Sequence, residues 1–257
     1  MGEKLHSFKL SDVQINDSFW NRYRELVRKN MLPYQWKVLN DQVPGAAPSH
    51  CIENFKIAAG ISRGEYYGQV FQDSDVAKWL EAVSYSLETD PDKELEKEAD
   101  QVIDILEKAQ QPDGYLDTYY LIKEPGMRWS NLREGHELYV AGHMIEAGIA
   151  YYQATGKRKL LDIVIRMADC ICDTFGAEAE KIQGCPGHPE IELAFIKLYR
   201  LTGEKKYLDK AQFFINLRGD QKPDRFDLEQ KSPQFHHIFP EFSYLGYNNI
   251  QAHLPVR

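Results

Sequence analysis

The sequence predicts an all-α protein whose helices form hairpins that repeat along the chain and assemble into a partial (α/α)6 toroid. Two observations carry this prediction: a hairpin motif that occurs twice, and a helical spacing of apolar residues beside it. A third observation is that no segment shows the convincing alternation of apolar and polar residues that marks a strand. Helical hairpins at a fixed repeat indicate an array of antiparallel pairs, stacked as a solenoid or closed into an α/α toroid.

The repeated motif is Tyr-x-x-Thr-Gly-x-x-Lys-x-Leu-Asp. One copy contains Thr155-Gly156 and the other Thr202-Gly203, which are 47 residues apart (202 − 155). A degenerate third copy over 85–106 has Thr89-Asp90 in place of Thr-Gly. In each copy an amphipathic helix runs into this pair, where glycine accepts the left-handed conformation that ends a helix. Leu-Asp then opens the second helix of the hairpin.

The individual elements follow from apolar spacing and from start and stop signals. In the helix expected over 159–175, for example, one face carries Leu160, Leu161, Val164, Ile165 and Ala168. In chain order we expect helices over 17–39 with a break at Pro33, then over 54–60, 75–88, 92–110, 137–154, 159–175, 190–201 and 206–218. We expect a loop over 45–50 and an irregular segment over 63–71.

The helical pattern fails after Arg218. The segment 219–257 holds three prolines and no sustained helical period, so we expect an irregular, loop-rich end. Six hairpins at this repeat need roughly 280 residues, and the chain offers about three to four. We therefore expect residues 1–257 to form an incomplete (α/α)6-barrel domain. Its last hairpin face would be exposed and would associate with a missing C-terminal part or with another copy of the chain.

Composition excludes several classes of function. The chain has 257 residues, 43% of them hydrophobic, with a net charge of -8 and no basic block, which argues against nucleic-acid binding. No apolar run has the length of a signal peptide or a membrane span, so no membrane partner is expected. Four cysteines are too few for a disulfide framework in a chain of this length. Reduced thiols in the cytoplasm are the simple interpretation.

The first candidate site residue is His136, which stands beside Glu137 at the start of an expected helix. His143 follows one heptad later, so the two histidines lie on nearly the same helix face. The zinc motif HExxH is absent, because Val140 stands where its second histidine belongs. Neutral histidine is also a partner for sugar hydroxyls. We interpret His136 as functional and His143 as a packing residue.

The second candidate is His188, which Pro186 and Gly187 place at the N-terminus of another expected helix. A helix N-terminus lowers the pKa of a histidine and keeps it neutral. Glu190 and Glu192 are interpreted as helix-start acids that complement the dipole. No phosphate loop, serine nucleophile elbow or singled-out carboxylate pair appears.

A further polar loop lies over 111–120. The turn Pro112-Asp113-Gly114 leads us to expect Asp113, Tyr115 and Asp117 at the mouth of the toroid. Among the cysteines, Cys170 and Cys172 are two apart in a helix and are better explained by packing than by a metal site.

Many segments, in one order, resemble the catalytic domain of glycoside hydrolase family 127, the β-L-arabinofuranosidase-like enzymes. No single segment carries the resemblance, which covers nearly the whole chain. The segments are Phe19-Trp20, Pro33–Trp36, Asn54–Gly60, Phe71–Ala82, Asp113–Leu116, Arg128-Trp129, Asn131–Arg133, His136–Tyr139, Pro186–His188, Glu190–Ala194 and Gln251–Arg257.

The resemblance implies an (α/α)6 toroid that hydrolyses non-reducing-end β-L-arabinofuranosyl linkages of small oligosaccharides or glycosides with retention. In the family a zinc-bound cysteine thiolate is the nucleophile and a glutamate is the acid/base, which is sensible because zinc keeps a thiol deprotonated. By position, residues that match sugar contacts are His136, His188, His253 and Gln35. The catalytic pair and the zinc ligands are expected beyond Arg257, so we expect no catalytic residue and no metal ligand in this chain.

Two alternatives remain. The chain could be a non-catalytic helical carbohydrate-binding module, which the lack of a nucleophile would favour. It could also be another (α/α)6 sugar enzyme, such as an unsaturated glucuronyl hydrolase or an epimerase, which shares the fold more than the motifs.

Overall fold

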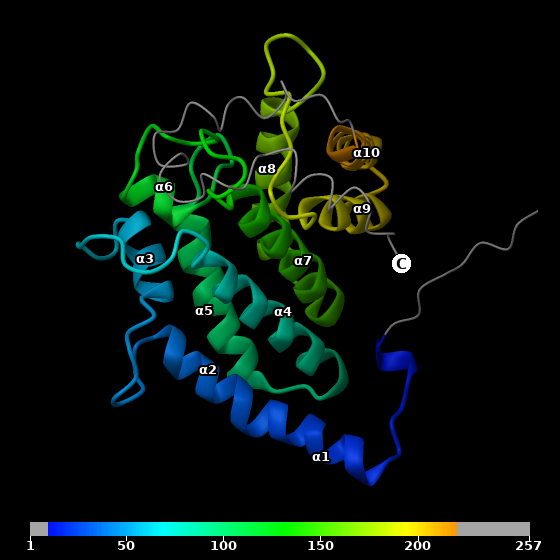
Figure 1. Ribbon diagram of the computed structural model, residues 1–257. Helices are drawn as coiled ribbons and strands as arrows, with labels where there is room; N and C mark the ends of the chain where they lie inside the picture. Colours follow the sequence, from blue (N-terminus) through cyan, green and yellow to red (C-terminus); the bar gives the residue numbers. More distant parts are fainter. Residues whose placement is uncertain (1–9, 220–257) are drawn as a thin grey trace, which may run out of the picture.

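The computed structural model describes residues 10–219, and within them the chain is helical, as predicted (Figure 1). A short 3-10 helix (Leu10–Asp12) precedes the α-helices, and one isolated bridge joins Phe175 to Ile182. No strand forms in this part of the chain, and none of its helices is long and apolar enough to cross a membrane. The α-helices are α1 (Ser18–Leu26), α2 (Leu32–Leu39), α3 (Cys51–Ala58), α4 (Asp73–Thr89), α5 (Lys93–Ala109), α6 (Thr118–Ile122), α7 (Glu137–Thr155), α8 (Lys159–Thr174), α9 (Ile191–Thr202) and α10 (Lys205–Gly219).

The helices form two layers that run side by side. In the first layer, called the inner layer below, α2 packs on α4, α4 on α7, and α7 on α9. In the second, the outer layer, α5 packs on α8, and α8 on α10. Each hairpin joins the layers, because α4 contacts α5, α7 contacts α8 and α9 contacts α10. Figure 1 shows α4 and α7 next to each other in the middle of this array. Two concentric rows of antiparallel helices are the wall of a partial α/α toroid, which confirms the predicted fold class.

The repeated motif makes the same turn in both complete copies. Gly156 and Gly203 follow α7 and α9 with φ values of 73° and 77°, the left-handed conformation that glycine adopts without strain. The hydroxyl of Thr155 donates to the Tyr151 carbonyl at 2.6 Å and accepts from the Lys157 amide at 3.2 Å. Thr202 makes the equivalent bonds to the carbonyl four residues earlier and the amide two residues later. The threonine hydroxyl thus joins the last turn of the helix to the first amide after the glycine.

The degenerate third copy connects its two helices, α4 and α5, through a different turn. Asp90 follows α4 with φ of −137°, so this turn needs no glycine. Instead, the Asp92 carboxylate accepts from the amides of Glu94 and Leu95 and caps the N-terminus of α5. The sequence change from Thr-Gly to Thr-Asp therefore keeps the hairpin and alters only its turn.

Close approach between the layers depends on small residues of α7. This helix is buried over most of its surface, because α4, α8 and α9 all pack against it. A Cβ on Gly148 would lie 2.6 Å from Cγ2 of Val164 on α8. A Cβ on Gly142 would lie 2.7 Å from Cγ of Glu190, just before α9. These two glycines set how near α8 and α9 come to α7.

The structure corrects the expected break at Pro33. The chain continues from α1 into α2 through a π-helical turn, Val27–Met31, and Pro33 falls in the first turn of α2. The wider π turn accommodates a residue that lacks an amide donor and crowds the preceding turn. The other expected helices are confirmed, with ends shifted by up to three residues. The irregular segment expected over 219–257 lies outside the described residues, apart from Gly219 at the end of α10.

One short helix was not expected. α6 begins in the polar loop over 111–120 and ends at Ile122, and Asp117 caps it by accepting from the Tyr120 amide at 3.3 Å. Of the three residues expected at the toroid mouth, Asp113 is exposed, whereas Tyr115 and Asp117 are each 2% exposed and do not present their side chains there. Both side chains instead take part in buried hydrogen bonding that holds this loop to the helices.

Candidate functional site

The two histidines singled out in the sequence lie together. The Nε2 atoms of His136 and His188 are 3.2 Å apart, and their ring centroids are 5.0 Å apart. They are 52 residues apart in the chain, and each stands just before a helix of the inner layer, α7 and α9. At this distance one imidazole N–H can donate to the lone pair of the other ring, so the pair is compatible with neutral histidines.

The backbone around Gly187 brings these histidines together. Its amide donates to the Leu132 carbonyl at 3.2 Å, which joins the loop before α9 to the loop before α7. A Cβ on Gly187 would lie 2.4 Å from the Arg133 carbonyl oxygen, a distance that no side chain can occupy. His136 itself has a φ of 58°, an uncommon left-handed conformation for a residue with a side chain. Such strain at a candidate site is a common feature of functional residues.

Tyr139 lies at the centre of the histidine group. Its ring centroid is 5.7 Å from that of His136, 5.2 Å from His188 and 4.6 Å from His143. The Tyr139 hydroxyl accepts a hydrogen bond from the Lys78 ammonium on α4 at 2.9 Å. The Tyr139 ring therefore contacts all three imidazoles, and Lys78 holds that ring through its hydroxyl.

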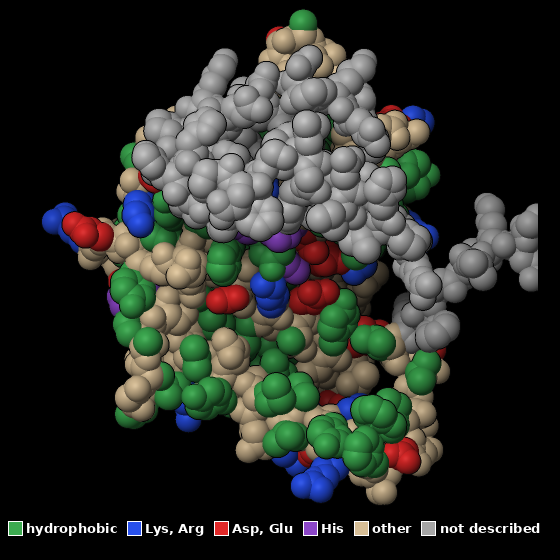
Figure 2. Space-filling view, in the orientation of Figure 1, with side chains coloured by type: hydrophobic (Ala, Val, Ile, Leu, Met, Phe, Trp, Pro, Cys, Tyr) green, Lys and Arg blue, Asp and Glu red, His purple; other side chains and the backbone are tan. Residues whose placement is uncertain are grey.

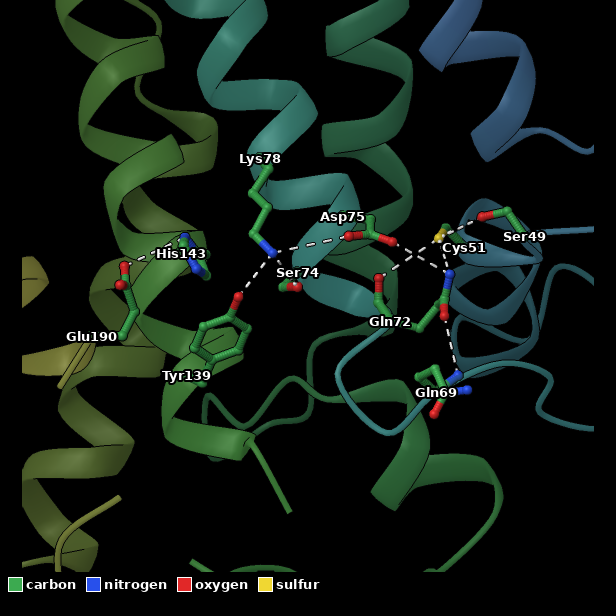
Figure 3. Close-up of polar contacts among 10 residues, drawn as sticks. All are labelled: Ser49, Cys51, Gln69, Gln72, Ser74, Asp75, Lys78, Tyr139, His143 and Glu190. Carbon is green, nitrogen blue, oxygen red and sulfur yellow. Dashed lines mark hydrogen bonds and ion pairs between the residues drawn. The ribbon is translucent and has the colours of Figure 1, made fainter. Parts of the chain in front are cut away.

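A row of polar groups runs from Tyr139 across the first turns of α4 to Cys51 (Figure 3). Lys78 also donates to the Ser74 hydroxyl at 3.0 Å and lies 4.0 Å from Asp75. Gln72 bonds to Asp75 at 3.4 Å and to the thiol of Cys51 at 3.2 Å. Lys78 and Asp75 are 41% and 42% exposed, so both can reach a bound molecule. Figure 2 shows acidic, basic and histidine side chains gathered on the face over α4 and α7.

His188 is exposed, whereas His136 is half-buried. Partial burial lowers the pKa of His188, and the neighbouring His136 lowers it further. Its backbone is held from the far side, because the Arg218 guanidinium donates to the His188 carbonyl at 3.2 Å. Arg218 also donates to Glu192 at 2.9 and 3.1 Å, so Glu192 anchors this loop to α10. The group thus offers imidazole rings, an aromatic ring and one ammonium, a combination that can form hydrogen bonds with the hydroxyls of a polyol.

A buried carboxyl lies directly beneath His136. Glu137 is 4% exposed, and it accepts from the Tyr115 hydroxyl at 2.5 Å and from the Trp129 amide at 2.7 Å. Burial raises the pKa of Glu137 to about 8, against the lowering effect of these two donors. The contacts tie the polar loop to the first residue of α7, and so to the position of His136.

A second buried carboxyl joins α6 to α4. Asp73 accepts from the Thr118 amide at 2.6 Å and from the Thr118 hydroxyl at 2.5 Å. Burial raises the pKa of Asp73 to about 6, and it raises the pKa of Asp117 as well. These bonds hold the first residue of α6 to the first residue of α4.

The other predicted site residues are not part of this arrangement. Gln35 is exposed on α2, and no hydrogen bond or ring contact of the described residues joins it to His136 or His188. His253 lies outside the described residues. The sequence analysis did not select Tyr139 or Lys78, although Tyr139 stands between His136 and His143 on the same helix face.

Three of the four cysteines in the described residues have surroundings that disfavour a thiolate. Burial raises the pKa values of Cys51, Cys170 and Cys172 to about 11, the opposite of what a thiolate ligand needs. Within residues 10–219, no group of three metal-ligating side chains includes a cysteine.

Comparisons with known proteins place these observations in a family. The profile described as "Beta-L-arabinofuranosidase, GH127 catalytic domain" matches residues 12–257. A non-reducing-end β-L-arabinofuranosidase from Bifidobacterium longum is 43% identical over 262 residues, which cover 96% of this chain and 40% of that protein.

Two solved structures are also similar. A GH127 β-L-arabinofuranosidase from Geobacillus stearothermophilus T6 has a TM-score of 0.87 and 57% identity, over 94% of this chain and 38% of that one. The GH127 β-arabinofuranosidase BT3674 has a TM-score of 0.74 and 40% identity, over 84% of this chain and 35% of that one. The chain thus spans about 40% of the length of the curated relative it matches.

Proposed function

This chain belongs to glycoside hydrolase family 127, and from that premise we propose that it supplies a sugar-binding wall of a retaining β-L-arabinofuranosidase. The substrate would be a terminal β-L-arabinofuranosyl group on a small oligosaccharide or glycoside. The observation that carries the proposal is the His136–His188 pair, with its Nε2 atoms 3.2 Å apart on the half-exposed face of the inner helices.

The chemistry of the pair supports a sugar ligand. A neutral imidazole offers one donor and one acceptor, and a furanoside presents several hydroxyls that can take either role. The Tyr139 ring adds an apolar surface on which the C–H face of a sugar can rest. Lys78 and Asp75 stand at the edge of this surface, where they can bind hydroxyls farther from the histidines. Gln35 and His253 are proposed as additional sugar contacts on the family resemblance alone.

We place the catalytic step of the proposed reaction outside residues 10–219. The family resemblance implies a zinc-bound cysteine nucleophile and a glutamate acid/base, and the buried thiols in the described part have raised pKa values. The role proposed for His136, His188 and Tyr139 is therefore to bind and orient the arabinofuranosyl ring. Correct orientation alone contributes substantially to catalysis, because it replaces an encounter with a fixed geometry.

The proposal is tested by hydrolysis of p-nitrophenyl β-L-arabinofuranoside with zinc and reductant present. The assay compares this chain with a chimera in which it replaces the matching part of the Geobacillus stearothermophilus relative. We expect the chimera to be active on the arabinofuranoside and inactive on an unsaturated uronide. The change His136→Gln should abolish this activity in the chimera. A folded chimera with no arabinofuranosidase activity, or with a preference for the uronide, would overturn the proposal.

A further inference from the structure

A second cluster of ionisable groups lies beyond Tyr139 on the same helices. Glu81 of α4 and His143 and Glu146 of α7 each offer one metal-ligating atom, and these atoms all lie within 4.8 Å of one another. Glu146 is buried, while Glu81 and His143 are half-buried. Three such donors from two packed helices are within reach of a single ion.

Two buried atoms at this cluster lack hydrogen bonds. Nδ1 of His143 and Oε1 of Glu190 are both inaccessible to solvent, and neither has a hydrogen-bond partner among the described residues. They face each other at 3.4 Å (Figure 3). A buried polar atom without a partner costs free energy, and a bound cation would offset that cost.

The charge balance favours a cation. Three carboxylates, those of Glu81, Glu146 and Glu190, meet here, and Lys197 of α9 is bonded to Glu146. Glu81 accepts a hydrogen bond from the Tyr85 hydroxyl at 2.7 Å, which leaves its second oxygen available.

We propose that Glu81, His143 and Glu146 bind a divalent cation of the Zn²⁺ or Mn²⁺ class, with Glu190 as a fourth ligand from the start of α9. Imidazole and carboxylate donors are suited to these ions. This site contains no thiol and is separate from the zinc–cysteine centre that the family resemblance implies. Bound metal would join α4, α7 and α9 across the inner layer. It would also hold the His143 ring in contact with Tyr139, and so stabilise the position of the Tyr139 ring between the histidines.

The test is a titration of the metal-free 257-residue chain with MnCl₂, in which the electron paramagnetic resonance signal reports the free ion. We expect one equivalent to bind to the wild type and the same amount to the control Glu107→Gln. Glu107 is an exposed glutamate on α5, outside the cluster. The isosteric change Glu81→Gln should abolish this binding. Failure of the wild type to bind Mn²⁺, or full binding by Glu81→Gln, would overturn the proposal.

Two further measurements exclude trivial explanations. Lys197→Met leaves every ligand in place and removes the ammonium that competes for Glu146, so Mn²⁺ should bind more tightly to this variant. Weaker binding would contradict the proposed ligand set. Co²⁺ should bind without the near-ultraviolet charge-transfer band that a thiolate ligand produces, whereas that band would assign the ion to cysteine. Circular dichroism melts of each metal-free variant establish that the protein is folded.

Discussion

A Cβ atom on Gly187 would lie 2.4 Å from the carbonyl oxygen of Arg133. This contact between the loops before α9 and α7 explains why a glycine stands next to His188, and why His188 reaches His136. The two loops cannot separate without also separating the imidazoles. The integrity of the candidate site therefore depends on a position that carries no functional group.

The change Gly187→Ala is expected to weaken sugar binding and to destabilise the fold by about 1 to 3 kcal/mol, the usual cost of overpacking. Thermal melts and calorimetric titration with methyl β-L-arabinofuranoside measure the two effects. The matched control is Gly64→Ala, whose Cβ would meet only the flexible end of the Ile57 side chain at 3.1 Å. Equal sugar affinity in Gly187→Ala and wild type would show that this contact does not position His188.

Tyr139 should act through its ring more than through its hydroxyl. Tyr139→Phe keeps the contacts with the three imidazoles and removes one hydrogen bond from Lys78, which retains its bond to Ser74. We expect a change in unfolding free energy of about 1 kcal/mol or less and near-normal sugar binding. Tyr139→Ala should lose sugar binding, because it releases all three histidines. A titration of both variants decides the point, and equal losses would contradict this role for the ring.

Glu137 predicts a stability that falls as the pH rises. Its pKa is raised from 4.5 to about 8 in the folded chain, so between these values the folded state holds a proton that the unfolded state has released. The contribution of Glu137 is fully present below pH 4.5 and is lost as the pH rises towards 8. Denaturant unfolding should give a wild type that is less stable at pH 8 than at pH 5.

The matched variant for this prediction is Glu137→Gln. Glutamine keeps an oxygen that can accept from the Trp129 amide but cannot ionise, so the stability of this variant should decline less over the same pH interval. Asp73 and Asp117 have raised pKa values as well, and their contribution should remain in the variant. Parallel stability curves for the two proteins would show that Glu137 does not hold a proton in the folded state.

Asp73 should be important for stability. Asp73→Ala leaves the buried amide and hydroxyl of Thr118 without their acceptor, which should cost about 2 to 3 kcal/mol in unfolding free energy. Asp104→Ala on the outer layer breaks only an exposed pair with Lys159 and should cost about 0.5 kcal/mol or less. Urea unfolding of both variants measures the difference, and comparable losses would contradict the importance assigned to the buried bonds.

The repeated hairpins could be predicted because their signals are local. Thr155-Gly156 and Thr202-Gly203 specify a turn through their own hydroxyls and their own left-handed glycines, which a sequence states directly. The break predicted at Pro33 is wrong, since a proline ends a regular helix, whereas here a π-helical turn before it absorbs the strain. The formation of this π-helical turn depends on how the turn packs, and no residue type in the sequence predicts it.

The site was predicted only in part, for a related reason. His136 and His188 stand out because each opens a helix beside distinctive residues. The contact of Lys78 with Tyr139 joins residues 61 positions apart and arises only when α4 packs on α7. Likewise the sequence predicts Glu190 as a helix-start acid, which it is, but its approach to His143 follows from Gly142, which lets the start of α9 come close to α7.

The most direct test of the account is the affinity of this chain for methyl β-L-arabinofuranoside, measured by isothermal titration calorimetry. The compared variants are His136→Gln and His188→Gln. The control is His50→Gln, because His50 has the same left-handed conformation before α3 but contacts Tyr67 and Asp41. The account predicts saturable binding to the wild type and the control, and its loss in both site variants. Binding of equal strength in all four proteins would contradict the assignment of the His136–His188 pair as the sugar-binding site.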